Sequence, residues 1–266
     1  MHQSFKNKIV WVTGASSGIG EALVKAFAEQ GAKIILSARR ENELKRVAQE
    51  AKLPEENYLI LPFDLTDTSK ASFYVEEILR RYGRIDVLVN NGGYSQRSEA
   101  KDTSLDIDRK LMEVNYFSVI SLTKSVLPVM LKQESGQLIV MSSIAGKFGF
   151  YLRSSYSAAK HALQGFFESL RLETEKHGIK TLIVCPGKIK TNISFSAVTA
   201  DGKQHDQMDE SHKNAMSTED CATIILNALQ KGEEEILIGG KEIKAVLIKR
   251  FFPKLFGKII RKQSPF

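Results

Sequence analysis

The sequence predicts a single doubly wound α/β domain of the Rossmann type, in which a parallel sheet is flanked by helices. Short apolar runs alternate with longer segments of helical periodicity along all 266 residues, as expected for successive β-α-β units. A glycine-rich turn joins the first apolar run to the first helical segment. No repeat, Pro-rich linker or low-complexity tract interrupts this pattern, so residues 1–266 are expected to form one domain.

The first β-α unit carries a nucleotide-binding pattern. The run Ile9-Val10-Trp11-Val12 has the composition of a buried strand, and apolar side chains recur at helical spacing from Leu23 to Ala28. Between them lies Thr13-Gly14-Ala15-Ser16-Ser17-Gly18-Ile19-Gly20. Glycines in such a turn let the backbone approach a pyrophosphate, which then lies at the positive N-terminus of the helix. The alternative is a tight turn that only packs the helix on the strand.

The end of the second strand, expected over residues 33–38, indicates which dinucleotide binds. NAD sites usually carry an acidic residue about 20 positions after the glycines, where it binds the ribose 2′-hydroxyl. Here the chain reads Ala38-Arg39-Arg40. A guanidinium group fits a 2′-phosphate, and the missing carboxylate removes the repulsion that this phosphate would meet. The sequence therefore favours NADP(H) over NAD(H), although two arginines also suit a solvated strand end.

The remaining elements continue the alternation. Ser217 and Asp220 form a capping-box pattern at the start of the last helix that covers the sheet. Each crossover between parallel strands is expected to be right-handed. Further strands are expected near residues 57–63, 86–90, 137–142, 180–185 and 235–238. Helices are expected near residues 18–30, 41–51, 68–82, 105–131, 154–177 and 218–230.

Tyr156 and Lys160 form the strongest catalytic pattern in the chain. Their spacing of four in a helix-compatible segment places both side chains on one face. A nearby ammonium favours phenolate over phenol, so Lys160 is expected to lower the pKa of the tyrosine from about 10 toward neutral pH. Such a phenol gives a proton to a carbonyl oxygen or takes one from an alcohol. Ser143, earlier in the chain, supplies a hydroxyl that suits the same oxygen.

Together these residues resemble the short-chain dehydrogenase/reductase family of the Tyr-x-x-x-Lys type. The matches keep the family's order over nearly the whole chain, and the ordered series is far more specific than any single match. Residues 91–98 and 102–106 are similar to the dehydrogenase/reductase member 7 subgroup, which is associated with NADPH-dependent reduction of lipophilic carbonyls, including steroids and retinoids, at intracellular membranes. The matched motifs are residues 13–20, Asp64-Leu65, Asn90-Asn91-Gly92-Gly93, Asn115, Ser143, Tyr156 with Lys160, and Pro186-Gly187 followed by Thr191.

The resemblance implies a role for each matched residue. Tyr156 transfers the proton, Ser143 orients the substrate oxygen, Lys160 also holds the nicotinamide ribose, and Asn115 binds a water that links Lys160 to solvent. Asp64 and Leu65 match positions beside the adenine, Asn91 the ribose region, and Ile19 and Thr191 the stretch from pyrophosphate to nicotinamide. The implied cofactor-binding set is Gly14, Ser16, Ser17, Gly18, Ile19, Gly20, Arg39, Asp64, Leu65, Asn91, Tyr156, Lys160, Pro186, Gly187 and Thr191.

Two positions depart from the family pattern. Gly92 stands where alanine is usual and is expected only to loosen a turn beside the cofactor. Ser17 stands where some NADP-preferring relatives have a basic residue, which leaves Arg39 with most of the phosphate recognition.

The polar stretch 194–216, between the sixth strand and the last sheet-covering helix, is expected to form a substrate lid over the active site. It contains His205 and His212 together with Asp206 and Asp209. Their spacing matches no metal-ligand motif, so no metal site is expected.

The C-terminal segment 241–266 is basic and amphipathic. It holds eight lysines and arginines against Glu242 alone, a net charge of +7 that equals the net charge of the whole chain. Apolar residues are interleaved with these cations, which suits a helix on an anionic membrane. The alternative is that the apolar face covers the substrate pocket or a neighbouring subunit. Pro253 is expected to divide the segment into two short helices, and nucleic acid is not expected as a partner because no readout motif accompanies the charge.

We therefore expect an NADPH-dependent oxidoreductase that interconverts a carbonyl and an alcohol, acting on a small lipophilic ketone or aldehyde. The alternative is a catalytically idle NADPH-binding scaffold at a membrane surface, although no catalytic position is lost. Cys185 and Cys221 imply no disulfide framework, and the first strand begins too close to Met1 for a signal peptide. A cytoplasmic location, with possible peripheral contact with a membrane, is therefore expected.

A homodimer or homotetramer is also expected. The helices near 105–131 and 154–177 resemble those that pair across a two-fold axis in the family. In the second helix the side chains expected to meet the partner are Ala158, Ala159, Ala162, Phe166, Phe167 and Leu170.

Overall fold

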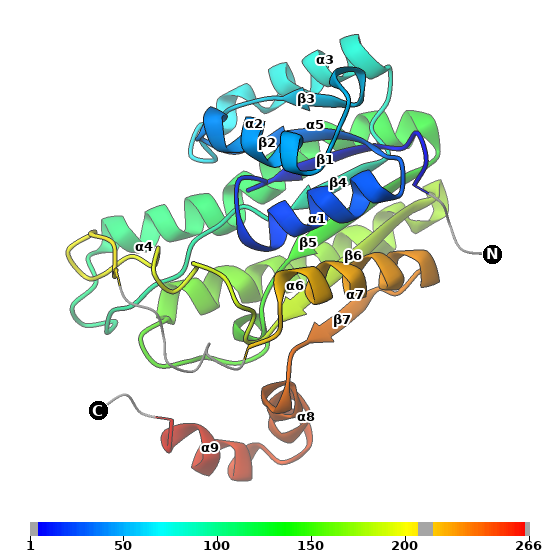
Figure 1. The fold of residues 1–266 in the computed structure, drawn as a ribbon. Helices are drawn as coiled ribbons and strands as arrows, with labels where there is room; N and C mark the ends of the chain where they lie inside the picture. Colours follow the sequence, from blue (N-terminus) through cyan, green and yellow to red (C-terminus); the bar gives the residue numbers. More distant parts are fainter. Residues whose placement is uncertain (1–4, 207–214, 264–266) are drawn as a thin grey trace.

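A computed structural model describes residues 5–206 and 215–263. Its seven strands form one parallel sheet in the order β3-β2-β1-β4-β5-β6-β7 (Figure 1). The order reverses direction between β1 and β4, and ligands of open α/β sheets bind beyond the carboxyl ends of the strands at such a switch point. The strands are β1 Ile9–Thr13, β2 Lys33–Ser37, β3 Tyr58–Ile60, β4 Val87–Asn90, β5 Gly136–Met141, β6 Ile179–Pro186 and β7 Glu235–Ile238. The expected fold class is confirmed.

Two helix layers cover the sheet. Side chains of α1 (Gly18–Glu29), α2 (Glu41–Glu50) and α7 (Thr218–Lys231) pack in one core cluster with one face of the strands. Those of α3 (Ala71–Tyr82), α5 (Ser118–Gln133) and α6 (Ser154–Thr174) pack in a second cluster against the other face. The remaining helices are α4 (Leu105–Met112), α8 (Lys244–Phe251) and α9 (Pro253–Arg261).

The strands are mostly apolar because both faces of the sheet are covered. Successive side chains of a strand point to opposite faces. In β1, Val10 and Val12 therefore join the cluster under α1, whereas Ile9 and Trp11 join the cluster under α3 and α5. The buried indole nitrogen of Trp11 is satisfied, because it donates to Ser37 Oγ on β2 at 2.9 Å.

The helix expected near 105–131 is interrupted. It consists of α4, one π-helical turn over Glu113–Phe117, and α5. The side-chain amide of Asn115 donates to the carbonyl of Leu111 at 3.0 Å and so competes with the regular ladder of the helix. The extra residue of such a turn places one side chain where a regular helix would not, and these turns are frequent at functional sites.

Other boundaries differ by a few residues. The third strand is limited to Tyr58–Ile60, and one 3₁₀ turn, Thr68–Lys70, precedes α3. Ser217 caps α7 as expected, since its hydroxyl accepts from the amide of Asp220 at 3.0 Å. The expected break at Pro253 is also confirmed, because this residue begins α9.

The stretch Leu105–Gln133 is long and apolar enough to cross a membrane by length and composition, with 44% of its most apolar window buried. In the structure its second half, α5, lies on the sheet. Val119, Leu122, Val126 and Met130 are buried there in the core cluster. The packing is therefore that of a core helix.

The surface expected to meet a second subunit is partly wrong. Ala159 and Phe167 are fully buried and Leu170 is nearly so, and the two larger side chains pack in the core between α6 and the sheet. Ala158 is exposed, and Ala162 and Phe166 are half-buried. Neighbouring residues on a helix point in different directions, so only Ala158, Ala162 and Phe166 remain available to a partner. The oligomer itself stays a prediction.

Candidate active site

The four expected catalytic side chains come from three elements at the carboxyl ends of the central strands. Ser143 follows β5, Tyr156 and Lys160 lie in α6, and Asn115 lies in the π-helical turn. Tyr156, Lys160 and Asn115 are buried, at 7%, 5% and 0% exposure. The Lys160 ammonium lies 5.7 Å from the centre of the Tyr156 ring. The structure thus brings together residues that are separated by up to 45 positions in the chain.

Burial dominates the acid–base properties of Tyr156. Burial raises the pKa of its phenol, and a hydrogen bond with Ser143 and the charges of Arg153 and Arg97 only partly oppose this. Lys160, which was expected to lower the pKa of this phenol, is not among the groups that shift it. Tyr156 therefore carries its proton at neutral pH, which is the form that donates to a carbonyl oxygen.

Lys160 is held by the backbone of β5. Its ammonium donates to the carbonyl of Met141 at 2.8 Å, and burial lowers its pKa from 10.5 to about 8. The lysine therefore remains mostly protonated at neutral pH, but at a cost, since the charge is buried without an acidic partner among the described residues.

Asn115 presents a free acceptor beside Lys160. Its amide nitrogen donates to the carbonyls of Tyr94 and Leu111, both at 3.0 Å. Its buried Oδ1 has no hydrogen-bond partner among the described residues. A Cβ placed on Gly93 would lie 2.5 Å from that oxygen and 3.8 Å from the Lys160 ammonium. Buried acceptors are usually paired, so this geometry suits the water that the family resemblance places between Asn115 and Lys160.

Gln96 holds the start of the catalytic helix, a role that the sequence did not reveal. Helix α6 has no side-chain cap of its own. The fully buried Gln96 instead accepts from the amides of Ser155 at 3.0 Å and Tyr156 at 3.3 Å through its carbonyl oxygen. Its amide nitrogen donates to the hydroxyls of Ser98 and Thr103. Gln96 thus caps α6 from a distant loop and fixes the backbone of the residue that carries the phenol.

The glycine turn is shaped for close approach. Gly14 has a φ of 64°, and a Cβ there would lie 2.8 Å from the Cα of Gly92. Gly20 has no room for a Cβ because the carbonyl of Gly14 occupies that space. Ser17 precedes α1 without capping it through its side chain, so the first amides of α1 remain available to an anion.

Two side chains brace this turn from behind. The Asn91 amide nitrogen donates to the carbonyls of Thr13 at 3.0 Å and Gly14 at 3.2 Å. The Thr13 hydroxyl donates to Val89 and accepts from the amides of Asn91 and Gly92. Asn91, expected in the ribose region, therefore has a structural task in its side chain, and Thr13 is an additional residue of the site.

The expected adenosine end gathers three polar side chains. Arg39 is exposed and forms no ion pair with any residue in the described part of the chain. The charges of Arg39 and Asp64 both act on the hydroxyl of Tyr94, whose pKa burial raises to about 12. Asp64 also accepts from the backbone amide of Thr66 at 2.9 Å, which fixes its side chain. Tyr94 thus belongs to this end of the site, although the sequence assigned it no role beyond its place in the segment 91–98.

Gly92 does more than loosen a turn. An alanine Cβ at this position would collide with Cδ1 of Leu65. The leucine side chain therefore occupies space that the usual alanine would take. Because that clash involves the end of a flexible side chain, an alanine would require Leu65 to move rather than the backbone.

The opposite end of the site is built from the loop after β6. The Ser143 hydroxyl donates to the carbonyl of Pro186 at 3.4 Å, and the Gly187 amide donates to Ile238 at 2.7 Å. A Cβ on Gly18 would lie 3.4 Å from the Thr191 methyl group, so Thr191 faces the start of α1. The structure therefore brings the loop after β6 up to the start of α1, and the expected cofactor roles of Ile19, Gly187 and Thr191 stay predictions.

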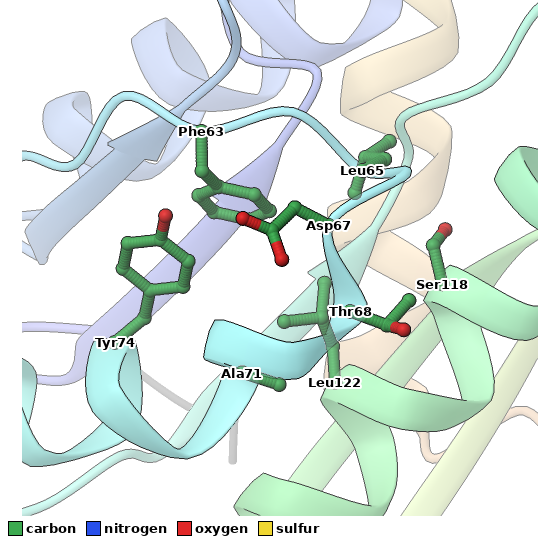
Figure 2. Close-up of a pocket in the computed structure, with 8 residues that line it drawn as sticks. All are labelled: Phe63, Leu65, Asp67, Thr68, Ala71, Tyr74, Ser118 and Leu122. Atoms are coloured by element: carbon green, nitrogen blue, oxygen red, sulfur yellow. The ribbon is translucent and has the colours of Figure 1, made fainter.

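A small cavity lies beside Leu65. It has a volume of about 10 Å³ and lies between the loop 63–68, α3 and α5 (Figure 2). None of the four catalytic side chains lines it, and a volume of this size holds about one water. It is therefore a packing defect behind Leu65 and not a cofactor or substrate site.

The first part of the expected lid pairs with the loop that contains Gln96. Val198 donates to the carbonyl of Ser95 at 2.9 Å and accepts from the amide of Arg97 at 2.8 Å. The Arg97 guanidinium also donates to Ser194 Oγ at 3.1 Å. Residues 207–214, with His212 and Asp209, lie outside the described residues. The described part of the chain contains no cluster of potential metal ligands, and His205 is not in one.

Comparisons with known proteins follow the same lines. A family model described as short chain dehydrogenase matches residues 8–202. "Dehydrogenase/reductase SDR family protein 7-like" of Anopheles gambiae is 39% identical over 263 residues, which cover 97% of this chain and 83% of that protein. "Dehydrogenase/reductase SDR family member 7" of Homo sapiens is 43% identical over 237 residues, covering 86% of this chain and 69% of the human protein. A short-chain dehydrogenase structure from Streptomyces avermitilis aligns with a TM-score of 0.82 at 28% identity, covering 97% and 100% of the two chains.

Proposed function

Because the chain belongs to the short-chain dehydrogenase/reductase family, we propose that it is an NADPH-dependent oxidoreductase that interconverts a lipophilic carbonyl compound and its alcohol. The oxidoreductase class follows from the family. The cofactor preference, the substrate class and the direction are our proposal. The observation that carries it is the group of the half-buried Ser143 with the buried Tyr156, Lys160 and Asn115, in which the phenol is protonated.

The residues present fit a dinucleotide. The turn of residues 13–20 leaves no room for side chains at Gly14 and Gly20, and the uncapped start of α1 offers free amides to a pyrophosphate. Thr191 faces the start of α1, where these amides lie. When bound, NADPH supplies the hydride that reaches the carbonyl carbon. Lys160, Pro186 and Gly187 would hold the nicotinamide end, and Asp64 and Leu65 the adenine end.

The chain's own residues manage the proton. Ser143 holds and polarises the carbonyl oxygen of the substrate, and Tyr156 gives that oxygen a proton. The phenolate that remains is stabilised by the hydroxyl of Ser143 and by the positive charges of Arg153 and Arg97. The water held by Asn115 beside the Lys160 ammonium then returns a proton from solvent.

Arg39 supports the preference for NADPH. It stands at the end of β2, where an NAD site has an acidic residue, and its exposed guanidinium has no ion-pair partner in the described residues. It is thus available to a 2′-phosphate. Ser17, at the start of α1, carries no charge, so Arg39 supplies the main discrimination.

Exposed apolar side chains on the loops that follow the site residues support a lipophilic substrate. Tyr151, Ile193 and Phe195 are 37–39% exposed on loops that follow Ser143 and Thr191.

Both cysteines are free and buried, which fits a reducing compartment such as the cytoplasm. We further propose a homo-oligomer that uses the outer surfaces of α6, α5 and the π-helical turn before α5. In that turn Phe117 is 46% exposed, and Tyr116 packs edge-on against both Phe117 and the half-buried Phe166.

A cofactor and substrate screen tests the proposal. Oxidation of NADPH and of NADH is followed with ketones, aldehydes, quinones, steroids and retinal. The proposal expects turnover with NADPH on apolar carbonyls and at most weak turnover with NADH. Tight NADPH binding without turnover on any carbonyl or alcohol would instead favour the idle scaffold, and equal use of NADH would remove the role of Arg39.

A further inference from the structure

The two C-terminal helices lie beside the active site but outside both helix layers. After β7 the chain enters one 3₁₀ turn, Lys241–Ile243, and then α8 and α9. Figure 1 shows α8 and α9 set apart from the sheet and from the helices that cover it. Because they follow the carboxyl end of β7, they lie at the same end of the sheet as Ser143 and Pro186.

Three contacts fix this segment to loops of the site. Phe256 packs edge-on against Phe148 with ring centres 4.9 Å apart, and the Lys249 ammonium donates to the carbonyl of Lys147 at 2.6 Å. Glu242 accepts from the backbone amide of Lys188 at 2.9 Å. Lys147 and Phe148 belong to the loop after Ser143, and Lys188 belongs to the loop after Pro186. The tail therefore rests on the two loops that follow Ser143 and Pro186.

Each helix has a second, unpaired apolar face. Leu247 and Phe251 are four apart in α8, and Leu255 and Ile259 are four apart in α9, so each pair shares a face. With Phe252 at the joint they form what we call the apolar ridge, with exposures of 55%, 65%, 63%, 50% and 37% for Leu247, Phe251, Phe252, Leu255 and Ile259. Phe256 and Ile260 lie on the inner, half-buried side of α9. One face of the tail therefore packs on the protein, and the other is exposed.

The ridge is concentrated enough to need an explanation. Thirteen large apolar side chains of the described residues are exposed, and five of them fall within residues 247–259. Single exposed apolar residues are ordinary on protein surfaces, whereas a contiguous group marks a surface that binds something.

The charge around the ridge indicates what it binds. The exposed cations of the two helices form no ion pair with a carboxylate in the described part of the chain. The one acid of the segment, Glu242, is turned inward to Lys188. A protein partner usually carries charges of both signs, so a surface that binds it is expected to expose some acids. The exposed charged side chains of these two helices are all lysines and arginines. Those exposed cations are Lys244, Arg250, Lys254, Lys258 and Arg261.

We propose that the ridge binds the surface of a membrane that contains anionic lipid, and that it thereby places the substrate entrance against the bilayer. The large apolar side chains enter the acyl boundary while the lysines and arginines meet lipid phosphates. Because the inner side of α9 is seated on the loop after Ser143, a lipophilic substrate reaches the site from the lipid phase. This second part rests on the proposed function, whereas the membrane contact does not.

The test is co-sedimentation of the full chain with vesicles, without cofactor or substrate. Vesicles of phosphatidylcholine alone are compared with vesicles that also contain phosphatidylserine, at low and high salt. The proposal expects binding to the anionic vesicles, release as salt rises, and little binding to phosphatidylcholine alone. Absence of binding to anionic vesicles at low salt overturns it.

Two sets of variants locate the contact. Phe251→Ser with Phe252→Ser and Leu255→Ser should weaken vesicle binding about a hundredfold or more. Lys254→Glu with Lys258→Glu should weaken it at least tenfold and flatten the salt dependence, without changing any packed residue. The control for the ridge variant is Phe73→Ser, at an exposed position of α3. The control for the charge variant is Lys231→Glu, at an exposed position at the end of α7.

Each outcome decides the proposal. The proposal is overturned if the ridge and charge variants bind vesicles as tightly as wild type. It is also overturned if the control variants lose as much vesicle affinity as the ridge and charge variants do. If the ridge variant instead changes the oligomeric mass in light scattering and leaves vesicle binding intact, a second copy covers the ridge and the proposal is wrong. Vesicle binding without turnover on any carbonyl would uphold the membrane contact while the proposed function fails. Entry of the substrate from the lipid phase is supported if the wild type reduces a vesicle-dissolved ketone faster than a water-soluble one and the charge variant loses this difference.

Discussion

Replacing Lys160 with methionine should make the folded protein less sensitive to pH while it abolishes activity. Burial lowers the pKa of Lys160 from 10.5 to about 8, so the folded state holds its proton less tightly than the unfolded chain does. Each tenfold change in proton affinity is worth about 1.4 kcal/mol, so the folded protein carries a penalty of about 3 kcal/mol below pH 8.

The sign follows from proton binding. Between pH 8 and 10.5 the unfolded chain binds more protons at this site than the folded protein, so the free energy of unfolding rises with pH. Methionine has a similar stem and no charge, which removes both the penalty and its pH dependence. The lost hydrogen bond to the Met141 carbonyl costs about 1 kcal/mol at every pH and does not change the slope.

Urea unfolding of both proteins from pH 7 to 10.5 measures the effect. The stability of the variant relative to wild type should be highest near pH 7 and should fall by about 3 kcal/mol by pH 10.5. Lys231→Met, an exposed lysine at the end of α7, is the control and should show no such trend. A difference between Lys160→Met and wild type that is constant with pH would refute the burial of a charged lysine.

The remaining predictions concern the cofactor, the positioning of the phenol and the pH profile. Arg39→Ala should weaken NADPH about 10- to 100-fold and leave NADH unchanged, whereas the neighbouring Arg40→Ala should do neither; titrations that show equal losses for both nucleotides would be inconsistent with phosphate recognition. Gln96→Leu should lower kcat about 10- to 100-fold with NADPH affinity within about threefold of wild type, and Gln96→Glu, which keeps the acceptor oxygen, should recover part of it; equal kcat in all three proteins would remove Gln96 as a positioning residue. The kcat/KM for reduction should be flat at neutral pH and should fall as pH rises through about 8, where Lys160 loses its charge while Tyr156 is still protonated; a profile that rises there would contradict this assignment.

Local patterns predicted the parts of this protein that depend on local sequence. The strand, glycine turn and helix of residues 9–29 are adjacent in the chain, and Tyr156 and Lys160 share one helical turn, so spacing alone placed them correctly. The Ser217 cap and the break at Pro253 are local for the same reason.

Features that depend on tertiary approach could not be read in this way. Gln96 caps a helix that begins 58 residues later, and its sequence context gives no sign of this. Phe166 and Phe167 are adjacent and equally apolar, yet only the structure shows which one meets the sheet. The pKa of Tyr156 was expected to fall because a cation is near, but burial of both groups opposes the charged form of each.

The most direct test of the central claim, proton transfer by Tyr156 in an NADPH-dependent reduction, is the Tyr156→Phe variant. Phenylalanine keeps the ring and removes only the hydroxyl, so NADPH binding should remain within a few-fold of wild type. Turnover of a ketone that wild type reduces should fall about a thousandfold or more, because the hydroxyl that gives the proton is gone. Reduction by Tyr156→Phe at a rate near that of wild type would contradict the account.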